Sequence, residues 1–451
     1  MILRNSLNFI PRFLDNTLKK FHNIYLNSNF YDKKISKINN DNLFYKPSPY
    51  LLSSLIKYQT NKINIENIKT ENMWNNKHMD SLNFKKLNNF YWFFTLDLKS
   101  SKNKTQNIIS EWIKENFKYN SQSWEFDLTS KRIIAWLSNH HLTIETSDKE
   151  YQNLFNWMIR KQTNHLMNEI NKSKVVDDKI IGCASIILVG LCYKDEKNYL
   201  SYGLNLLKKI SSFSFDNQGF PKSRNIKQLI LYLKYFILIR EWFKEAQVEI
   251  PEHINETIHY LGQAYAFVWQ NIKSDILMNG NNISENYEFD QYLKKLGYKF
   301  KNENKEYGGY AILHNKKISL IMDIGPSPSL KFSSKYQSGV LSFEVNSNGK
   351  KLISNCGHYN NNRNWKLKEL SKSTATQSTL VIDDSSSCHY KKDNDNFIIK
   401  NGLKTIKKNI TFEKNYWKIN ASHDGYQKKY NATHEREIEF YPEQFKFIGK
   451  D

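Results

Sequence analysis

The hydrophobic periodicity of this chain changes near residue 300, and this change constrains the fold more than any other feature. From about residue 85 to 285, apolar side chains recur at intervals of three and four, which predicts amphipathic helices. Beyond residue 305 they alternate with polar ones, as in Gly339–Val345, which predicts half-buried antiparallel strands. Asn348-Gly349 follows that run, and since both residues tolerate positive φ, a tight hairpin is expected. A helical domain followed by a β domain is therefore predicted.

Two helical segments, Ile180–Tyr193 and Leu229–Phe243, are apolar nearly all round, which is typical of helices inside a packed layer. Helix pairs joined by short polar loops favour an α/α toroid or solenoid. We therefore predict an α+β multidomain chain, with an N-terminal (α/α) toroid followed by an antiparallel β-sandwich. The expected parts are a polar, loosely helical extension over residues 1–75, the toroid over 76–285, a polar linker at about 274–305 and the sandwich over 300–451.

Strand-like runs follow the linker and are separated by turn residues, which is typical of a β-sandwich. The predicted strands are Ile312–Leu313, Ile318–Ile324, Val340–Val345, Thr379–Ile382, Phe397–Ile399, Tyr416–Ile419 and Glu437–Phe440. The chain stops at Asp451 shortly after a strand, with no closing element.

The chain of 451 residues carries 66 Lys and Arg against 45 Asp and Glu, a formal net charge of +21. Such a surplus attracts polyanions, namely nucleic acid, acidic lipid or acidic polysaccharide. Lysine, asparagine and isoleucine are frequent throughout, so the charge alone selects no partner. The sequence has no zinc-finger spacing, helix-turn-helix signal or RNA-binding aromatic motif, so nucleic acid is the least favoured partner.

The sequence shows no signal peptide and no run of about 18 apolar residues, so no transmembrane segment is predicted. Its four cysteines form no Cys-x-x-Cys pair and predict no disulfide framework.

Several motifs occur in a fixed order between residue 85 and the end of the chain. They are the Trp…Arg-hydrophobic-x-x-Trp segment Trp124–Leu137, the Asn-His-Leu segment Asn164–Leu166, the loop Gln218–Asn225 that ends in Arg-Asn, the hairpin between Tyr336 and Gly357, Trp365, the segment Ser373–Thr379, and the later strands at His423–Tyr426 and Glu435–Glu437. In this order they resemble the heparinase II/III-like family, polysaccharide lyases with an α/α-toroid followed by an antiparallel β-sandwich. The resemblance covers roughly residues 85–451. Family members usually run on past the position of Gly449, so the resemblance implies an incomplete sandwich with an unpaired edge, which a homo-oligomer or a companion fragment would complete.

The resemblance implies β-elimination on a uronic-acid polysaccharide. Hydrogen-bond donors must neutralise the substrate carboxylate, and a base and an acid must then move protons. Asn164 and His165 match the family's positions for neutralisation and proton transfer. A structural alternative stays open, in which they are hydrogen-bond partners of neighbouring carbonyls in the helical domain.

The family's catalytic tyrosine follows the Arg-Ser-Pro loop, but the aligned residue here is Gln228, which cannot ionise. Tyr232 is the candidate replacement and Tyr235 lies one turn further on, although core packing is favoured for both in this apolar run. The resemblance assigns substrate binding to Arg224 and Asn225.

Many family members bind a metal at three positions that read Gln337, Asn355 and Gln377 in this chain. Zinc requires His, Cys or carboxylate ligands, so we predict no metal and no cofactor. His358 and His389 are close in sequence but do not replace these ligands.

The three amides remain candidates for hydrogen bonds to sugar hydroxyls, and Arg132 is a further candidate substrate-binding residue. Trp124 and Trp365 are candidates for stacking on a sugar face.

Two functions are compatible with these residues. The first is a heparinase II/III-like polysaccharide lyase acting on an acidic polysaccharide. The second is a catalytically lapsed relative that binds anionic glycan or assists envelope assembly, which the loss of the family tyrosine and metal ligands favours. The resemblance implies the cell envelope or periplasm, and the missing signal peptide leaves the cytoplasm open. The sequence does not indicate which glycan or linkage is involved.

Overall fold

The computed structural model of this chain describes residues 17–37, 43–53, 65–67, 73–74, 79–97, 99–193, 198–270, 272, 275–281, 287–359, 364–393 and 396–451. The chain divides into two compact units. Unit 1 contains Met1–Ile210 and Leu238–Ile250, and unit 2 contains Ser211–Ile237 and Pro251–Asp451. The sequence predicted a domain boundary near residue 300. In the structure, helical segments before residue 300 belong to the same unit as the strands. Part of the expected extension over residues 1–75 lies outside the described residues.

Unit 1 is helical. Its helices are α2 (Asn29–Ile35), α3 (Pro49–Ser53), α4 (Ser81–Asn88), α5 (Lys102–Glu115), α6 (Phe126–Ser138), α7 (His140–Thr143), α8 (Lys149–Glu169), α9 (Val176–Cys192), the first part of α10 (Tyr199–Ser214) and the last part of α11 (Ile226–Glu245), with short 3₁₀ turns at Ile65–Asn67, Tyr91–Thr95 and Ile170–Lys172. The apolar α9 packs against α6 and α8, which agrees with its predicted place inside a helical layer. Gly190 allows a close approach to α10, since a Cβ atom there would lie 2.5 Å from the backbone nitrogen of Leu200.

Unit 2 combines helices with the strands. Its helices are the rest of α10 and α11, α12 (Glu252–Tyr265) with a π-helical turn at Ala266–Gln270, α13 (Tyr287–Lys295), α14 (Trp365–Leu370) and α15 (Gln427–Tyr430), with 3₁₀ turns at Leu330–Phe332 and Thr374–Thr376. Its strands are β1 (Glu306–Tyr307), β2 (Tyr310–His314), β3 (Ile318–Asp323), β4 (Phe343–Ser347), β5 (Lys350–Ile353), β6 (His389–Asp393), β7 (Asn396–Asn401), β8 (Thr405–Phe412), β9 (Trp417–His423), β10 (His434–Tyr441) and β11 (Lys446–Lys450).

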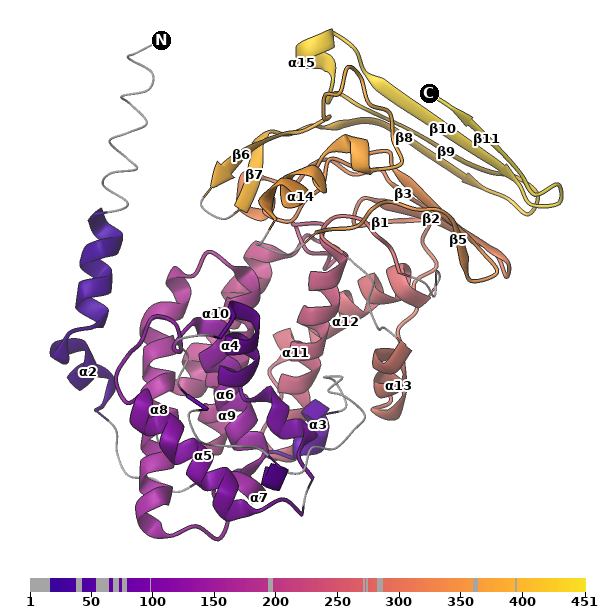
Figure 1. The fold of residues 1–451 in the computed structure, drawn as a ribbon. Helices are drawn as coiled ribbons and strands as arrows, with labels where there is room; N and C mark the ends of the chain where they lie inside the picture. Colours follow the sequence, from indigo (N-terminus) through magenta and orange to yellow (C-terminus); the bar gives the residue numbers. More distant parts are fainter. Residues whose placement is uncertain are drawn as a thin grey trace. The chain divides into compact units, whose positions relative to one another are not determined.

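The strands form two stacked antiparallel sheets and a separate hairpin (Figure 1). One sheet has the order β1-β2-β3-β4-β5, the other β11-β10-β9-β8, and β6 pairs with β7. Alternate side chains of both sheets share one core, which includes Leu320 and Val345 from the first and Ile419 and Phe440 from the second. This packing is a β-sandwich, so the predicted α+β multidomain fold is confirmed. Among the described residues, no helix is both long and apolar enough to cross a membrane.

The hairpin at Asn348-Gly349 is confirmed, because both residues have positive φ (48° and 76°) between β4 and β5. The strand before it begins at Phe343 and not at Val340, since Leu341 adopts a left-handed conformation with φ of 63°.

The predicted strand at Thr379–Ile382 is wrong. The hydroxyl of Thr379 bonds to Val340 O, and only an isolated bridge between Ile382 and Ser385 forms. The sequence prediction also missed α13 inside the expected linker, and the largely exposed strand β8.

Candidate functional site

Asn164 and His165 are adjacent on α8, and both side chains are buried in unit 1. The Asn164 amide nitrogen donates to the carbonyl oxygen of Ile35 at 2.8 Å, and its amide oxygen accepts from the Tyr199 hydroxyl at 2.9 Å. His165 Nδ1 lies 2.8 Å from the Tyr31 hydroxyl. Residues of α2 and α10 therefore form hydrogen bonds with the side chains of Asn164 and His165, the predicted catalytic pair. In this conformation, the atoms that make these contacts are not available to bind another group.

The His165 imidazole is enclosed by aromatic rings. The ring centroids of Tyr119, Trp124 and Phe126 lie 5.1, 5.5 and 5.8 Å from it. Burial lowers the pKa of His165 to about 3, so the imidazole is neutral at neutral pH. Trp124, predicted to stack on a sugar, instead lies buried against this ring and donates its indole N–H to Asn116 O at 3.2 Å. The structure therefore brings Trp124 and His165 together within the packed interior.

Arg132 on α6 is fully buried in unit 1, and burial lowers its pKa well below the ordinary value. Its guanidinium lies 3.9 Å from the centre of the Trp112 ring. It donates hydrogen bonds of 2.8–3.3 Å to Gln162 Oε1, Asn88 O, Ser123 O and Thr129 Oγ1. These bonds connect α4, α6 and α8, so in this conformation the guanidinium is committed to protein oxygens.

Arg224 lies in the loop before α11, in unit 2, with the left-handed φ of 60° that is uncommon for a residue with a side chain. Its guanidinium NH2 group lies 2.7 Å from Asp323 Oδ1, and both side chains are buried. The same guanidinium donates to the carbonyl oxygens of Gly309, Gly325 and Pro326. The Arg224 side chain therefore fastens the loop to the β2–β3 region.

Asn225, the neighbour of Arg224, stands just before α11 and accepts a hydrogen bond from Lys227 N through its side-chain oxygen. Its amide nitrogen is buried and has no hydrogen-bond partner among the described residues. Gln228, at the family's tyrosine position, accepts a hydrogen bond from the Ser223 hydroxyl at 2.5 Å. Tyr232 is buried within unit 2, with its ring 5.5 Å from that of Phe215. Its role as a base stays a prediction.

One segment of unit 2, between Ser371 and Ser378, contacts the three residues at the family's metal-ligand positions. We call these residues, Gln337, Asn355 and Gln377, the amide cluster. The side-chain nitrogens of Gln337 and Gln377 both donate to Ser371 O, at 2.7 and 3.4 Å. The oxygen of Asn355 accepts from the backbone N–H of Ser378, the residue after Gln377, at 2.8 Å. Hydrogen bonds between protein groups thus use amide atoms of all three residues, and this donor set does not fit a divalent metal. In the described ranges, no group of three or more His, Cys, Asp or Glu could hold a metal.

His358, next to this amide cluster, was not assigned a role by the sequence. Its backbone N–H donates to Asn281 O, and its buried Nδ1 atom lacks a hydrogen-bond partner in the part of the chain that the structure describes. Burial, with Lys372, Lys335, Lys368 and Lys227 nearby, lowers the pKa of His358 to about 3. Lys368 and Lys372 are close together in the sequence, but Lys227 and Lys335 are distant from them, so no local pattern indicated that the four lysines gather.

Trp365, the other predicted stacking residue, begins α14 and is 45% exposed. One of its faces packs on Phe397, with the ring centroids 5.4 Å apart, and the Lys392 ammonium lies 3.4 Å from the ring centre. This contact is a cation–π interaction of the kind found at partly exposed sites. Among the described residues, no hydrogen bond links Trp365 to the amide cluster.

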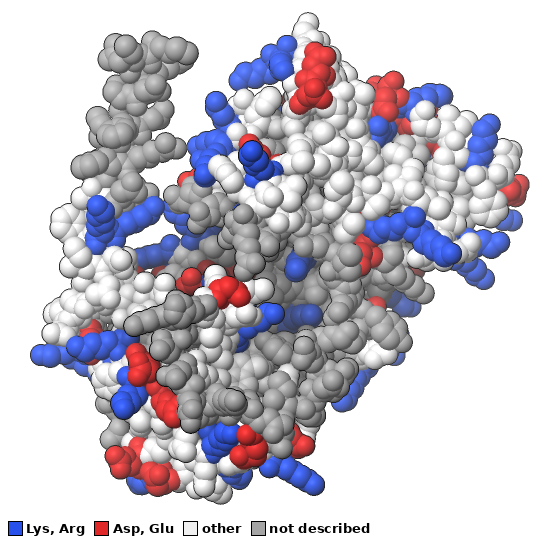
Figure 2. Space-filling view, in the orientation of Figure 1, with Lys and Arg blue, Asp and Glu red and all other residues white. Residues whose placement is uncertain are grey.

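The net charge of the chain does not by itself locate a binding site. On the face drawn in Figure 2, Lys and Arg side chains are scattered, and Asp and Glu side chains lie between them. On this face, the basic side chains of the described residues are therefore not gathered into one patch.

Buried histidines predict a loss of stability in mild acid. Burial lowers the pKa values of His165 and His358 to about 3, and burial with the neighbouring His434 does the same for His423. In the unfolded chain each titrates near ~6.5, so between about pH 3 and 6.5 the unfolded state binds more protons. The contribution of these histidines to stability is therefore fully present above about pH 6.5 and falls as the pH is lowered, by up to about 1.4 kcal/mol per pH unit for each histidine.

Urea unfolding midpoints at about pH 7.5 and pH 5 measure this effect. His423→Gln removes one titrating group and should make the loss smaller. An unchanged midpoint in acid would contradict the prediction.

The family model that matches this chain covers the part of unit 2 that carries the strands. Residues 303–451 match the family model described as heparinase II/III-like, C-terminal. No curated protein matches the sequence.

Solved structures resemble the chain over most of its length. A crystal structure of heparinase III has a TM-score of 0.62 at 16% identity, over 86% of this chain and 64% of its own. A heparan sulfate lyase HepC mutant from Pedobacter heparinus also has a TM-score of 0.62, at 12% identity, over 91% of this chain and 71% of its own. The chain thus spans less than two thirds of the first of these proteins. Residues 303–451 are therefore identified as a heparinase II/III-like C-terminal domain, and the chain has the fold of heparinase III, as its motifs predicted.

Proposed function

We propose that this protein is a polysaccharide lyase that cleaves an acidic, uronic-acid-containing polysaccharide by β-elimination. The observation that carries the proposal is the family match over residues 303–451, combined with the fold likeness to heparinase III and to a heparan sulfate lyase. The ordered motifs of the helical part support it, because the Asn-His pair stands at the family's position. The surplus of basic residues suits a polyanionic substrate.

In the proposed reaction, Asn164 donates a hydrogen bond to the substrate carboxylate and stabilises the charge that develops as the α-proton leaves. His165 and Tyr232 are the proposed proton-transfer groups. The low pKa of the buried His165 keeps its imidazole neutral, but a group with this pKa is a weak base, so proton transfer requires the pKa to rise when the site opens. Because Tyr31 and Ile35 of α2 bond to the pair, the reaction requires α2 to move away from α8.

Ultraviolet absorbance of the unsaturated uronate product tests the proposal. The full chain is incubated with alginate, heparin, heparan sulfate and polygalacturonate, and product is expected from at least one. His165→Gln should lower kcat by about 100-fold or more, while Lys446→Gln, on an exposed part of β11, should leave it unchanged. Circular dichroism of His165→Gln separates lost chemistry from lost folding. No product from any substrate would reject the lyase proposal.

The second candidate is a lapsed relative that binds acidic glycan without cleaving it. The observation that favours it is the hydrogen bonding of Gln337, Asn355 and Gln377 to protein groups at the family's metal positions, together with Gln228 at the tyrosine position. Salt-sensitive binding of an acidic glycan without product formation would support this candidate. Preferential binding of DNA over acidic glycans would contradict both candidates.

We further propose that the protein functions without a metal or other cofactor and acts in the cell envelope. Elemental analysis of the purified chain should find less than one zinc per molecule, and a chelator should not change product formation or glycan binding. Cell fractionation tests the location, and recovery only in the cytoplasm would overturn that part of the proposal.

A further inference from the structure

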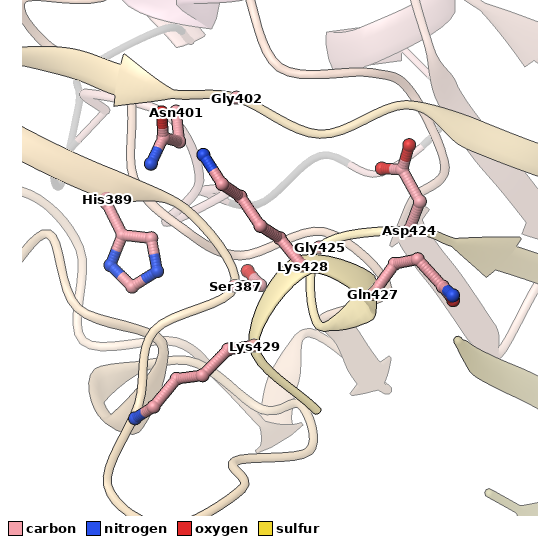
Figure 3. Close-up of a pocket in the computed structure, with 9 residues that line it drawn as sticks. All are labelled: Ser387, His389, Asn401, Gly402, Asp424, Gly425, Gln427, Lys428 and Lys429. Atoms are coloured by element: carbon pink, nitrogen blue, oxygen red, sulfur yellow. The ribbon is translucent and has the colours of Figure 1, made fainter. Parts of the chain in front are cut away.

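A cavity of about 520 Å³ lies in unit 2 (Figure 3), and none of its lining residues was assigned to catalysis or substrate binding, although Asp424 and Gly425 belong to the His423–Tyr426 motif. It is lined by Ser387, His389, Asn401, Gly402, Asp424, Gly425, Gln427, Lys428 and Lys429. Its size falls in the range of small-molecule sites, roughly 300–1,000 Å³. Most of the lining side chains carry hydrogen-bonding groups, and no Phe, Tyr or Trp is among them, which suits a polar ligand.

Two elements bring the donors together. His389 and Asn401 are paired across the β6–β7 hairpin, so their side chains project from neighbouring positions. Lys428 comes from α15, and Figure 3 shows its ammonium group directed toward Asn401 and His389. Gln427 and Asp424 lie on the opposite side of Lys428 in the same view.

Contacts away from the cavity hold this arrangement in place. The hydroxyl of Tyr426, just before α15, donates to Leu380 O at 2.7 Å. The hydroxyl of Tyr430, at the end of α15, lies 2.8 Å from Ser385 Oγ. The wall at Gly425 is tightly packed as well, because a Cβ atom there would lie 2.7 Å from a backbone carbonyl oxygen. The helix that carries Lys428 is therefore positioned before any ligand binds, which lowers the entropic cost of binding.

The charge of the lining favours an anion. It contains two lysines and one carboxylate, Asp424, and one oxygen of that carboxylate already accepts a hydrogen bond from Lys404 N at 2.6 Å. Lys429 donates to Ser385 Oγ, which leaves Lys428 as the cation directed at Asn401 and His389.

We propose that this cavity binds one sugar unit of an acidic saccharide outside the residues assigned to β-elimination. Lys428 and Asn401 hold the carboxylate or sulfate group, and Gln427 and Asp424 bind hydroxyls. The acidic class of the ligand is shared with the proposed function, but the site requires no turnover. Failure of the lyase assay therefore leaves this inference standing.

Titration of the full chain with size-defined oligosaccharides tests the site. The ligands are oligogalacturonate, a sulfated heparin oligosaccharide, free sulfate and a neutral cello-oligosaccharide, and binding is followed by hydrogen exchange of peptides over residues 385–402 and 424–431. Both acidic saccharides, or one of them, should slow exchange in these peptides. The neutral sugar should not.

Lys428→Gln should weaken this binding by about tenfold, because the loss of one hydrogen bond to a charged group typically lowers affinity by about this factor or more. Lys446→Gln, an equal change of charge on exposed β11, should alter it less than twofold. An effect of the two variants that is equal in size, protection by the neutral sugar, or no protection in these peptides would overturn the proposal. Protection by free sulfate alone would overturn the saccharide assignment.

Discussion

Arg224→Ala is expected to lower the free energy of unfolding of unit 2 by about 3–5 kcal/mol, the usual cost of breaking a buried ion pair from one side. The substitution leaves Asp323 without its guanidinium partner, and three backbone carbonyls lose their donor at the same time. Asn279 Nδ2 still donates to Asp323 Oδ2 at 2.8 Å, but this neutral amide does not compensate a buried carboxylate.

Denaturant unfolding, combined with hydrogen exchange of peptides from residues 306–347, measures the effect in unit 2. Arg224→Lys keeps the charge without the planar fork and should recover only part of the loss. Lys222→Ala, an exposed basic residue of the same loop, is the matched control and should cost less than about 0.5 kcal/mol. Equal stability of Arg224→Ala and Lys222→Ala would show that the buried pair contributes little, and substrate binding would then remain as the role of Arg224.

Arg132→Ala is expected to destabilise unit 1 by a similar amount, about 3–5 kcal/mol. Four oxygens lose their donor, and each buried acceptor left unsatisfied costs about 1–3 kcal/mol before the structure relaxes. The loss of the guanidinium stacked on Trp112 adds to this cost. Relaxation and entry of water keep the total below the sum of these contributions.

Lys131→Ala provides the control for this variant on the same helix. The Lys131 ammonium pairs with Asp127 at i,i+4 in a partly exposed position, so its removal should cost about 0.3–0.5 kcal/mol. Thermal unfolding with hydrogen exchange over residues 126–169 reports on unit 1. If Arg132→Ala unfolds like Lys131→Ala but loses glycan binding, the substrate-binding role predicted for Arg132 gains support and the structural role is rejected.

Hydrophobic periodicity predicted the fold class, because the apolar side chains that a helix or strand buries on one face are only two to four residues apart in the sequence. The helices α5, α6, α8 and α9 and the strands β2, β3, β9 and β10 all follow from such patterns. The turn at Asn348-Gly349 was also predictable, because its positive φ angles are a property of the two residues themselves. The edge strand β8 was missed because its side chains are mostly exposed and show no clear apolar alternation.

The surroundings of the candidate residues were not predictable from local patterns. Asn164 and His165 were recognised by their order in the motifs, yet their partners Tyr31 and Ile35 lie more than a hundred positions upstream. Arg224 and Asp323 are likewise about a hundred residues apart. Nothing in the sequence around one member of such a pair indicates the other.

The sequence by itself determined the change from helices to strands near residue 300, the family resemblance and the amide residues at the metal positions. Each of these depends on residue type and on spacing along the chain. Local backbone preferences and the burial of apolar side chains then determine the corresponding structure. Only the tertiary structure decided that Arg132, Trp124 and the Asn164–His165 pair are bonded within the interior, and that Lys428, His389 and Asn401 surround a cavity. The physical reason is that a side chain's exposure and hydrogen-bond partners are set by segments distant in sequence, which packing alone brings into contact.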